Sequence, residues 1–384
     1  MENHESSQIR TLSYVENEDH PVFGTLVEQI LHLLNSRLVF SDIIIHQNSP
    51  LLLRQPKGLV AVTDSPITKE ELEEFFEVIE PDWEARIKDR AFDRSIDLHT
   101  ARIRANCFTF QGKKRLGCVI RRFPKEPLAL ASLGLRTAEQ DFSQLTSGLV
   151  LIIGDTCQGK STTIASMVDE INKTRSGHII TIEDPVETLI PQRKCIITQR
   201  EVGQDGDVES YYLGALDALR ERPDVIVIGE IRDAETAQEA LALAESGPLV
   251  LASLHARSTE LGLQKMNRLL GNSEAQSQAL ASALRGVLCQ ALLPSVDGDR
   301  YYLATECLTS NPEVVRMVES ARFADVRTLM DGGTGKFNAG CHSMNSALVY
   351  LLREKKISME DARNATTDRI GFADACYAAM LNAA

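Results

Sequence analysis

One short segment constrains the fold of this chain more than any other feature. It has the pattern G-x-x-x-x-G-K-[ST], it follows the apolar run Leu149–Ile153, and it leads into a stretch of helical character. In this placement the backbone N–H groups of the loop and the positive end of the helix dipole surround a phosphate group. We therefore predict a P-loop that binds ATP, in which Lys160 reaches the β- and γ-phosphate oxygens and the Ser161 hydroxyl binds Mg²⁺. The predicted nucleotide-binding residues are Gly154, Asp155, Thr156, Cys157, Gln158, Gly159, Lys160, Ser161 and Thr162.

Apolar, β-branched runs surround this loop in the sequence. They cover Gly148–Ile153, Ile179–Ile182, Val225–Ile228 and Leu249–Leu254, with longer helical stretches between them. Strands that are apolar on both faces and alternate with helices are typical of a parallel sheet that is covered on two sides. We predict an α/β core over residues 136–309 and a mostly helical region over residues 310–384.

The first third of the chain has a different pattern. Residues 1–20 are polar, and we expect a flexible N-terminus there. Residues 21–122 predict a small α+β domain, because helical spacing alternates with short strand-like runs. Its predicted elements are helices over 26–38 and 67–86 and strands over 41–46, 100–107 and 116–122. A linker follows over residues 123–135, because the paired prolines Pro124 and Pro127 disfavour both a helix and a central strand.

Polar side chains follow three of the predicted strands, at the edge where ligands bind in an open parallel sheet. Glu183 and Asp184 end one strand, Glu230 follows another, and His255 follows a third. ATP hydrolysis needs a bound Mg²⁺, an oriented water and positive charge at the γ-phosphate. We predict that Glu230 orients the water and that Glu183 serves the metal or the same water. Ser161, Glu183 and Glu230 are the candidate Mg²⁺ ligands, and His255 is a candidate γ-phosphate sensor.

Two features of these strand ends bear on the prediction of a common site. Each polar residue, taken alone, also fits a turn or a surface loop, and only their occurrence on successive strands favours a common site. Gly229 stands where many P-loop proteins carry a metal-binding aspartate, and the acidic residue comes one position later.

Composition narrows the choice of partners and compartment. The net charge is −13, and a protein that binds duplex DNA normally has a basic surface, so we expect no direct nucleic-acid partner. The eight cysteines form no Cys-x-x-Cys pair, which favours reduced thiols in a cytoplasmic protein. The N-terminus does not resemble a secretory signal, and no apolar run reaches the roughly 20 residues that span a bilayer. We therefore expect that a partner recruits the protein to any membrane at which it acts.

Together these motifs resemble the secretion and twitching-motility ATPase family over about residues 22–365. The segment 181–187 resembles the Asp box of that family, 218–233 its Walker B segment, 253–256 its His box, and 198–203 a further motif. The chain is most similar to the type IV pilus retraction ATPases and their type IV secretion and conjugation relatives, because it lacks the four-cysteine insert of the type II branch. Residues 324–331 resemble a degraded copy of the retraction signature. In the P-loop, Asp155, Cys157 and Gln158 replace the usual Pro, Gly and Ser.

The resemblance implies a RecA-like ATPase core, a PAS-like N-terminal domain and a homo-hexamer. It implies ATP and Mg²⁺ as cofactors, and a platform or secretion-system protein at the inner membrane as partner. It also implies arginines that reach the γ-phosphate, which can contribute about 10³–10⁵ in rate. By motif match the candidates are Arg102, Arg104, Arg121 or Arg122, Arg220 and Arg232. The alternative is that Lys113, Lys114, Arg115, Arg121 and Arg122 form a solvated basic face.

Two other functions stay open at this point. A RecA-like nucleic-acid motor would have the same core, although the acidic balance of the chain disfavours it. A regulatory partner that binds ATP without turnover would fit the altered P-loop, although Lys160, Ser161 and Glu230 are all present.

Overall fold

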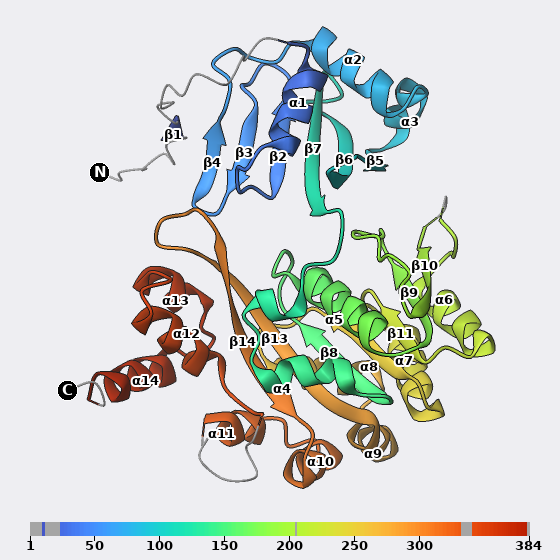
Figure 1. Cartoon of the computed structure of the whole chain (residues 1–384), viewed down its shortest axis with the longest axis vertical. Helices are drawn as coiled ribbons and strands as arrows, with labels where there is room; N and C mark the ends of the chain where they lie inside the picture. Colours follow the sequence, from blue (N-terminus) through green and yellow to red (C-terminus); the bar gives the residue numbers. More distant parts are fainter. Residues whose placement is uncertain (1–9, 12–23, 204–205, 332–339, 382–384) are drawn as a thin grey trace. The chain divides into compact units, whose positions relative to one another are not determined.

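The computed structural model describes residues 10–11, 24–203, 206–331 and 340–381, so the predicted flexible segment 1–20 lies almost entirely outside the described residues. The chain divides into two compact units (Figure 1). The first comprises residues 1–125 with residues 297–300, and the second comprises residues 126–296 and 301–384. Within the described ranges, no helix is both long and apolar enough to cross a bilayer.

The first unit contains a seven-stranded sheet in the order β1-β4-β3-β2-β7-β6-β5. Apart from the parallel pair β1 and β4, neighbouring strands run antiparallel. The strands are β1 (Arg10–Thr11), β2 (Asp42–His46), β3 (Leu52–Gln55), β4 (Gly58–Ala61), β5 (Phe92–Asp97), β6 (Ala101–Phe110) and β7 (Arg115–Pro124). The helices are α1 (Leu26–Asn35), α2 (Lys69–Ile79) and α3 (Trp83–Asp89).

One face of this sheet packs on the helices. In β6 the alternate residues Ile103, Ala105 and Cys107 are buried in a cluster with the apolar sides of α1 and α2, while Arg102 and Arg104 lie on the other face. Capping boxes begin both helices, at Thr25 with Glu28 and at Thr68 with Glu71. The mixed α+β character that the sequence predicts is confirmed.

Two predicted boundaries in this unit were wrong, and proline explains both. The single helix expected over 67–86 is two helices, because the residue before Pro81 is driven from the helical region, and Glu80 has φ −151° and ψ 101°. The expected linker begins later, since β7 continues through Pro124. Pro124 fits there because β2 pairs with β7 only as far as Arg121, so β7 has β6 alone as neighbour at its end.

The second unit contains another seven-stranded sheet, in the order β10-β9-β11-β12-β8-β13-β14. All neighbours are parallel except the antiparallel hairpin of β13 and β14. The strands are β8 (Gly148–Ile153), β9 (Gly177–Glu183), β10 (Cys195–Glu201), β11 (Val225–Ile228), β12 (Leu249–Leu254), β13 (Leu284–Pro294) and β14 (Tyr301–Thr309). The parallel core predicted from the apolar runs is confirmed, and β8, β11 and β12 have the predicted bounds.

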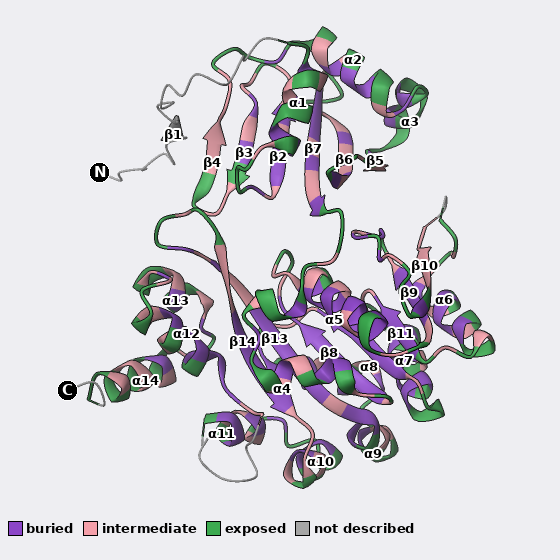
Figure 2. Ribbon diagram, in the orientation of Figure 1, coloured by how far each residue is buried: buried purple, intermediate pink, exposed green. Residues whose placement is uncertain are grey.

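Helices cover both faces of this sheet (Figure 1). Residues of β8 such as Val150 and Ile152 pack on α5 (Lys160–Thr174), whereas Leu149 and Leu151 face the opposite cluster, which includes α6 (Tyr211–Ala218) and α7 (Ala234–Ser246). The central strands are buried throughout their length (Figure 2). The remaining helices on the way to the hairpin are α8 (Thr259–Leu269) and α9 (Glu274–Ala283). Short helical segments also occur at η1 (Leu130–Leu133), α4 (Thr137–Gln140), η2 (Asp141–Gln144) and η3 (Leu219–Glu221).

The described residues after 309 are mostly helical, as the sequence predicts. They form α10 (Pro312–Glu319), α11 (Asp325–Asp331), α12 (Met344–Arg353), α13 (Met359–Ala365) and α14 (Arg369–Leu381). The predicted retraction-like signature falls on α11.

A buried carboxylate connects this helical region to the sheet. Glu306 of β14 is 7% exposed, and its two oxygens accept hydrogen bonds from the N–H of Thr259 at 2.6 Å and of Met344 at 3.4 Å. Those amides begin α8 and α12, whose N-terminal dipoles favour a negative charge. Glu306 therefore stabilises the starts of two helices that are far apart in sequence.

Candidate functional site

The predicted P-loop joins β8 to α5 and has the backbone of a phosphate cradle. Gly154 has φ 156°, and a Cβ atom there would lie 2.8 Å from the carbonyl oxygen of Gln290, so only glycine fits. Gly159 has the left-handed φ of 80° and caps α5. Cys157 also has a positive φ, 63°, although it carries a side chain. Thr156, Cys157 and Ser161 are exposed, which leaves the mouth of the loop open to a ligand.

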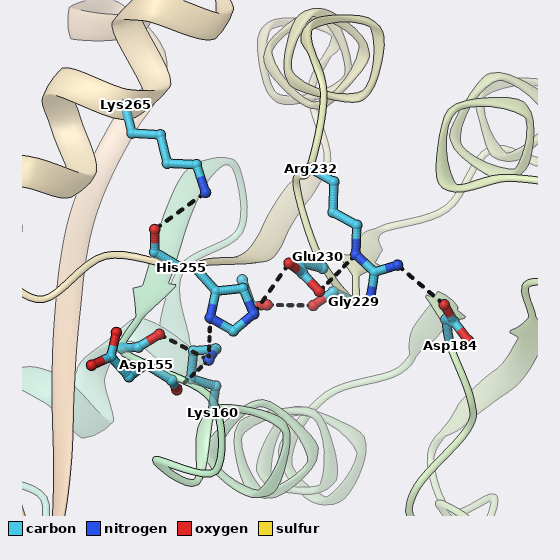
Figure 3. Close-up of polar contacts among 10 residues, drawn as sticks. Asp155, Lys160, Asp184, Gly229, Glu230, Arg232, His255 and Lys265 are labelled. Atoms are coloured by element: carbon cyan, nitrogen blue, oxygen red, sulfur yellow. Dashed lines mark hydrogen bonds and ion pairs between the residues drawn. The ribbon is translucent and has the colours of Figure 1, made fainter. Parts of the chain in front are cut away.

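The lysine of the loop folds back over it. The Nζ atom of Lys160 donates to the carbonyl oxygens of Gly154 at 2.9 Å and Asp155 at 2.8 Å, and lies 3.5 Å from Nδ1 of His255 (Figure 3). Burial lowers the pKa of the Lys160 ammonium, and the negative charge of Glu230 opposes that shift. A cation held only by neutral carbonyls and by an imidazole can be drawn to phosphate oxygens, which offer stronger, charge-assisted hydrogen bonds.

A second group of polar residues lies where β11 and β12 end. Oε1 of Glu230 is 3.1 Å from Nε2 of His255, and its Oε2 accepts from Nε of Arg232 at 2.9 Å. Nη1 of Arg232 also lies 3.4 Å from Oδ2 of Asp184. The guanidinium carbon of Arg232 lies over the ring of Tyr211, 5.6 Å from the ring centroid. Figure 3 shows that His255 links this group to Lys160, so the structure brings together the loop and the ends of two neighbouring strands.

Glu183 ends β9 next to this group. Its Oε1 accepts hydrogen bonds from Oγ1 of Thr181 at 2.6 Å and from Nε2 of Gln199 at 3.2 Å. Because Ile182 and Ile228 are register partners in β9 and β11, Glu183 and Glu230 follow adjacent strands. The carboxylate of Glu183 is thus held by donors on β9 and β10.

The structure explains why a glycine precedes Glu230. A Cβ atom on Gly229 would lie 2.9 Å from the carbonyl oxygen of Ile182 and 3.2 Å from the ring of Tyr211. The N–H of Gly229 donates to that same Ile182 oxygen at 2.8 Å, and its carbonyl accepts from the hydroxyl of Ser253. An aspartate has no room at this position, and the first acidic side chain that fits is Glu230.

The predicted arginines have different surroundings. Arg232 belongs to the Glu230 group, whereas Arg220 is 78% exposed and lies 3.6 Å from Asp217. In the first unit, Arg102 and Arg104 pair with Asp97 and Asp93 at 2.8 and 3.0 Å. Arg121 pairs with Asp42 at 2.9 Å, and the guanidinium of Arg122 lies over the ring of Phe40. Burial lowers the pKa of Arg122.

Several contacts at the site were not expected from the sequence. Nε of Arg257 lies 2.8 Å from Oδ2 of Asp155, and Lys265 donates to the carbonyl of His255 at 3.2 Å. The side chain of Gln158 accepts from the N–H of Leu292 at 2.6 Å. Asp155 and Gln158 were singled out in the sequence as substituted P-loop residues, but no pattern in the sequence indicates their partners.

The donor set fits Mg²⁺ with a bound triphosphate. Ser161 presents an exposed hydroxyl in the first turn of α5, and Glu183 and Glu230 bring carboxylates from adjacent strands. Mg²⁺ prefers oxygen ligands and is commonly held by one or two side chains together with phosphate oxygens.

Comparison with known proteins shows which family the chain resembles. A family model described as "Type II/IV secretion system protein" matches residues 81–347. The type IV pilus retraction ATPase PilT of Pseudomonas aeruginosa is 34% identical over 268 residues, which are 68% of this chain and 75% of that protein. The type IV pilus ATPase PilU of the same organism is 30% identical over 326 residues, 84% of each chain.

Solved structures match nearly the whole chain. The crystal structure of the pilus retraction motor PilT with bound ADP has a TM-score of 0.77 at 31% identity, covering 92% of this chain and 100% of that one. The ATPase DotB of Legionella pneumophila has a TM-score of 0.76 at 23% identity, covering 92% and 98%, which supports the fold alone.

Proposed function

Because the chain belongs to the type II/IV secretion system protein family, we propose that it is a hexameric, Mg²⁺-dependent ATPase that drives a type IV pilus or a related type IV secretion or conjugation machine. The observation that carries this proposal is the contact chain from Lys160 through His255 to Glu230. It connects the phosphate-binding loop to the carboxylate best placed to orient water.

We assign roles to the residues of this chain as follows. The amides of the P-loop bind the β-phosphate, and Lys160 exchanges the carbonyls of Gly154 and Asp155 for phosphate oxygens. Ser161 and Glu183 would hold Mg²⁺, which would supply positive charge to neutralise the charge that develops on the phosphates. Glu230 orients the attacking water, and His255 transmits the occupancy of the γ-phosphate position from Lys160 to Glu230. Arg232 holds the second oxygen of Glu230 and so fixes the carboxylate.

The arginines outside this group are proposed to act on assembly. Arg102, Arg104 and Arg122 of the first unit, and Arg220 of the second, would add positive charge to the γ-phosphate when the units and subunits close. A guanidinium supplied in this way contributes about 10³–10⁵ in rate. Hydrolysis would then depend on the oligomer, and the cycle would move one unit against the other. The membrane partner would be an inner-membrane platform or secretion-system protein that recruits the motor from the cytoplasm.

The test is phosphate release from Mg-ATP by protein that has been resolved by size. Wild type is compared with Lys160→Ala, with Glu230→Gln and with Glu235→Gln, a control in the first turn of α7, each with and without single-stranded DNA. We expect turnover in a ring-sized fraction, loss of turnover in the first two variants, no effect of the control, and indifference to DNA.

Other results would replace the proposal. ATP binding without turnover in every fraction would favour the regulatory-partner function, to which the substituted P-loop points. Turnover that rises strongly with single-stranded DNA would favour a nucleic-acid motor.

A further inference from the structure

An acidic side chain stands at an unexpected place in the phosphate-binding loop. Asp155 follows Gly154 directly, and its carbonyl oxygen is 2.8 Å from Nζ of Lys160. The loop is built to attract anions, so a bare carboxylate there would repel an incoming triphosphate. The structure gives this carboxylate a partner, because Nε of Arg257 lies 2.8 Å from its Oδ2.

Arg257 comes from the loop that also carries His255. This loop follows β12, the parallel neighbour of β8, so the carboxyl ends of both strands bring the two loops together. Hydrogen bonds hold its backbone at both ends. Lys265 donates to the carbonyl of His255, and the N–H of Thr259 donates to Glu306. The Arg257 side chain itself is 73% exposed and the Asp155 side chain 49%. The backbone is thus fixed while the ion pair stays open to solvent.

We propose that Arg257 is a positioning residue that holds the Asp155 carboxylate by this ion pair and keeps it from turning toward a bound phosphate, so that this loop can accept a triphosphate without the proline usual at position 155. The inference deepens the proposed function, since it rests on nucleotide binding at this P-loop. Arg257 acts through Asp155 and not on the phosphates. Loss of Arg257 therefore harms binding more while the Asp155 carboxylate is present, because the freed carboxylate can then turn toward the phosphates. It harms ATP more than ADP because ATP carries the larger negative charge.

A double-mutant cycle tests this relation. Binding of ATP and of ADP is measured by isothermal titration calorimetry for wild type, Arg257→Ala, Asp155→Asn and the double variant, with Arg353→Ala as an exposed control. We expect ATP affinity to fall on the order of three- to ten-fold in Arg257→Ala, the range for an exposed charge near other charges, with a smaller loss for ADP. In the Asp155→Asn background the loss caused by Arg257→Ala should be clearly smaller than in wild type.

Two further measurements separate charge from structure. Arg257→Lys should keep most of the affinity, because it keeps the charge. The defect of Arg257→Ala should shrink at high salt, which screens exposed charges. Thermal unfolding of each variant confirms that it is folded.

Different results would overturn the role of Arg257 and the proposed nucleotide binding. An Arg257→Ala protein that binds ATP as wild type does would overturn the inference alone. An equal loss in the wild-type and Asp155→Asn backgrounds would also overturn it, since Arg257 would then act on the phosphates independently of Asp155. A folded wild type that binds no nucleotide would overturn the proposed function, and the inference with it.

Discussion

Nε2 of His255 lies 3.1 Å from Oε1 of Glu230, and the opposite ring nitrogen lies 3.5 Å from Nζ of Lys160. Lys160 can only donate a hydrogen bond and an ionised Glu230 can only accept one. The neutral ring that satisfies both neighbours therefore has its proton on Nε2 and a lone pair on Nδ1. One imidazole in one tautomer connects the phosphate-binding lysine to the carboxylate that we propose orients water.

This tautomer predicts an order among substitutions of His255. The amide N–H₂ of glutamine can replace Nε2–H, whereas the shorter asparagine side chain reaches only the Nδ1 position. We expect His255→Gln to retain about 10- to 100-fold more ATP turnover than His255→Asn, the value of one hydrogen bond to a charged group. Steady-state phosphate release checks this, with nucleotide affinity measured in parallel. Equal turnover in the two variants would contradict the proposed donation to Glu230.

The lowered pKa of Lys160 predicts a pH dependence of nucleotide binding. Phosphates bind the ammonium form, so affinity should be lost as pH rises through a pKa that burial places below that of an ordinary lysine. Binding should also take up a proton at alkaline pH, because bound phosphates raise this pKa again. Titration calorimetry from about pH 8 upward, where the nucleotide phosphates are already ionised, measures both effects.

Lys160→Arg is the matched control for that experiment, because a guanidinium stays charged throughout. Its affinity should be weaker but nearly independent of pH. The same alkaline loss in Lys160→Arg would show that another group titrates.

The close packing around Gly229 predicts that a side chain at this position lowers the free energy of unfolding. Gly229→Ala places a methyl group against the Ile182 carbonyl and the Tyr211 ring, so the ends of β9 and β11 must separate. We expect a loss of about 1–3 kcal/mol in the free energy of unfolding, as for other overpacked sites. Urea denaturation measures this loss, and turnover should fall as well because Glu230 moves. Unchanged stability would show that the two strand ends separate freely.

Cys157 offers a chemical test of the nucleotide site. It is the exposed cysteine of the chain, while the others are buried or partly buried. We expect an alkylating reagent to label Cys157 first, and Mg-ATP to slow that labelling because the ligand covers the P-loop. Peptide mass spectrometry with and without nucleotide measures both rates, and Cys157→Ser removes the labelled peptide. Labelling at an unchanged rate under saturating ATP would argue against binding at this loop.

The sequence predicts the central sheet well and the edges of the site poorly. β8, β11 and β12 were predicted with their observed bounds, because strands buried on both faces give continuous apolar runs. The hairpin of β13 and β14 was not predicted, because it follows α9 directly and its polar residues interrupt the apolar run. The P-loop and Glu230 have local signals. The contacts of Arg257 with Asp155 and of Gln158 with Leu292 have none, because they join residues that only the fold brings together.

The charge of Glu306, which faces the start of α8 just after the His255 loop, is expected to contribute to the free energy of unfolding. Glu306→Gln keeps the shape of the side chain but removes the charge that faces the N-termini of α8 and α12. We expect a loss of about 1–3 kcal/mol in the free energy of unfolding, since two helix ends lose a charged acceptor. Urea denaturation measures it, with Glu319→Gln at the exposed end of α10 as control. Equal midpoints for the two variants would show that the charge is dispensable.

The two contacts of Glu306 also have a consequence for how the sequence can vary in evolution. One carboxylate accepts hydrogen bonds at the start of α8 and at the start of α12. A substitution near Ser343 that moves Glu306 would therefore also move the start of α8, where the His255 loop ends. We expect the residues of these two segments to change together among relatives of this chain. A C-terminal region exchanged between relatives should need its own β14 to keep both contacts of Glu306.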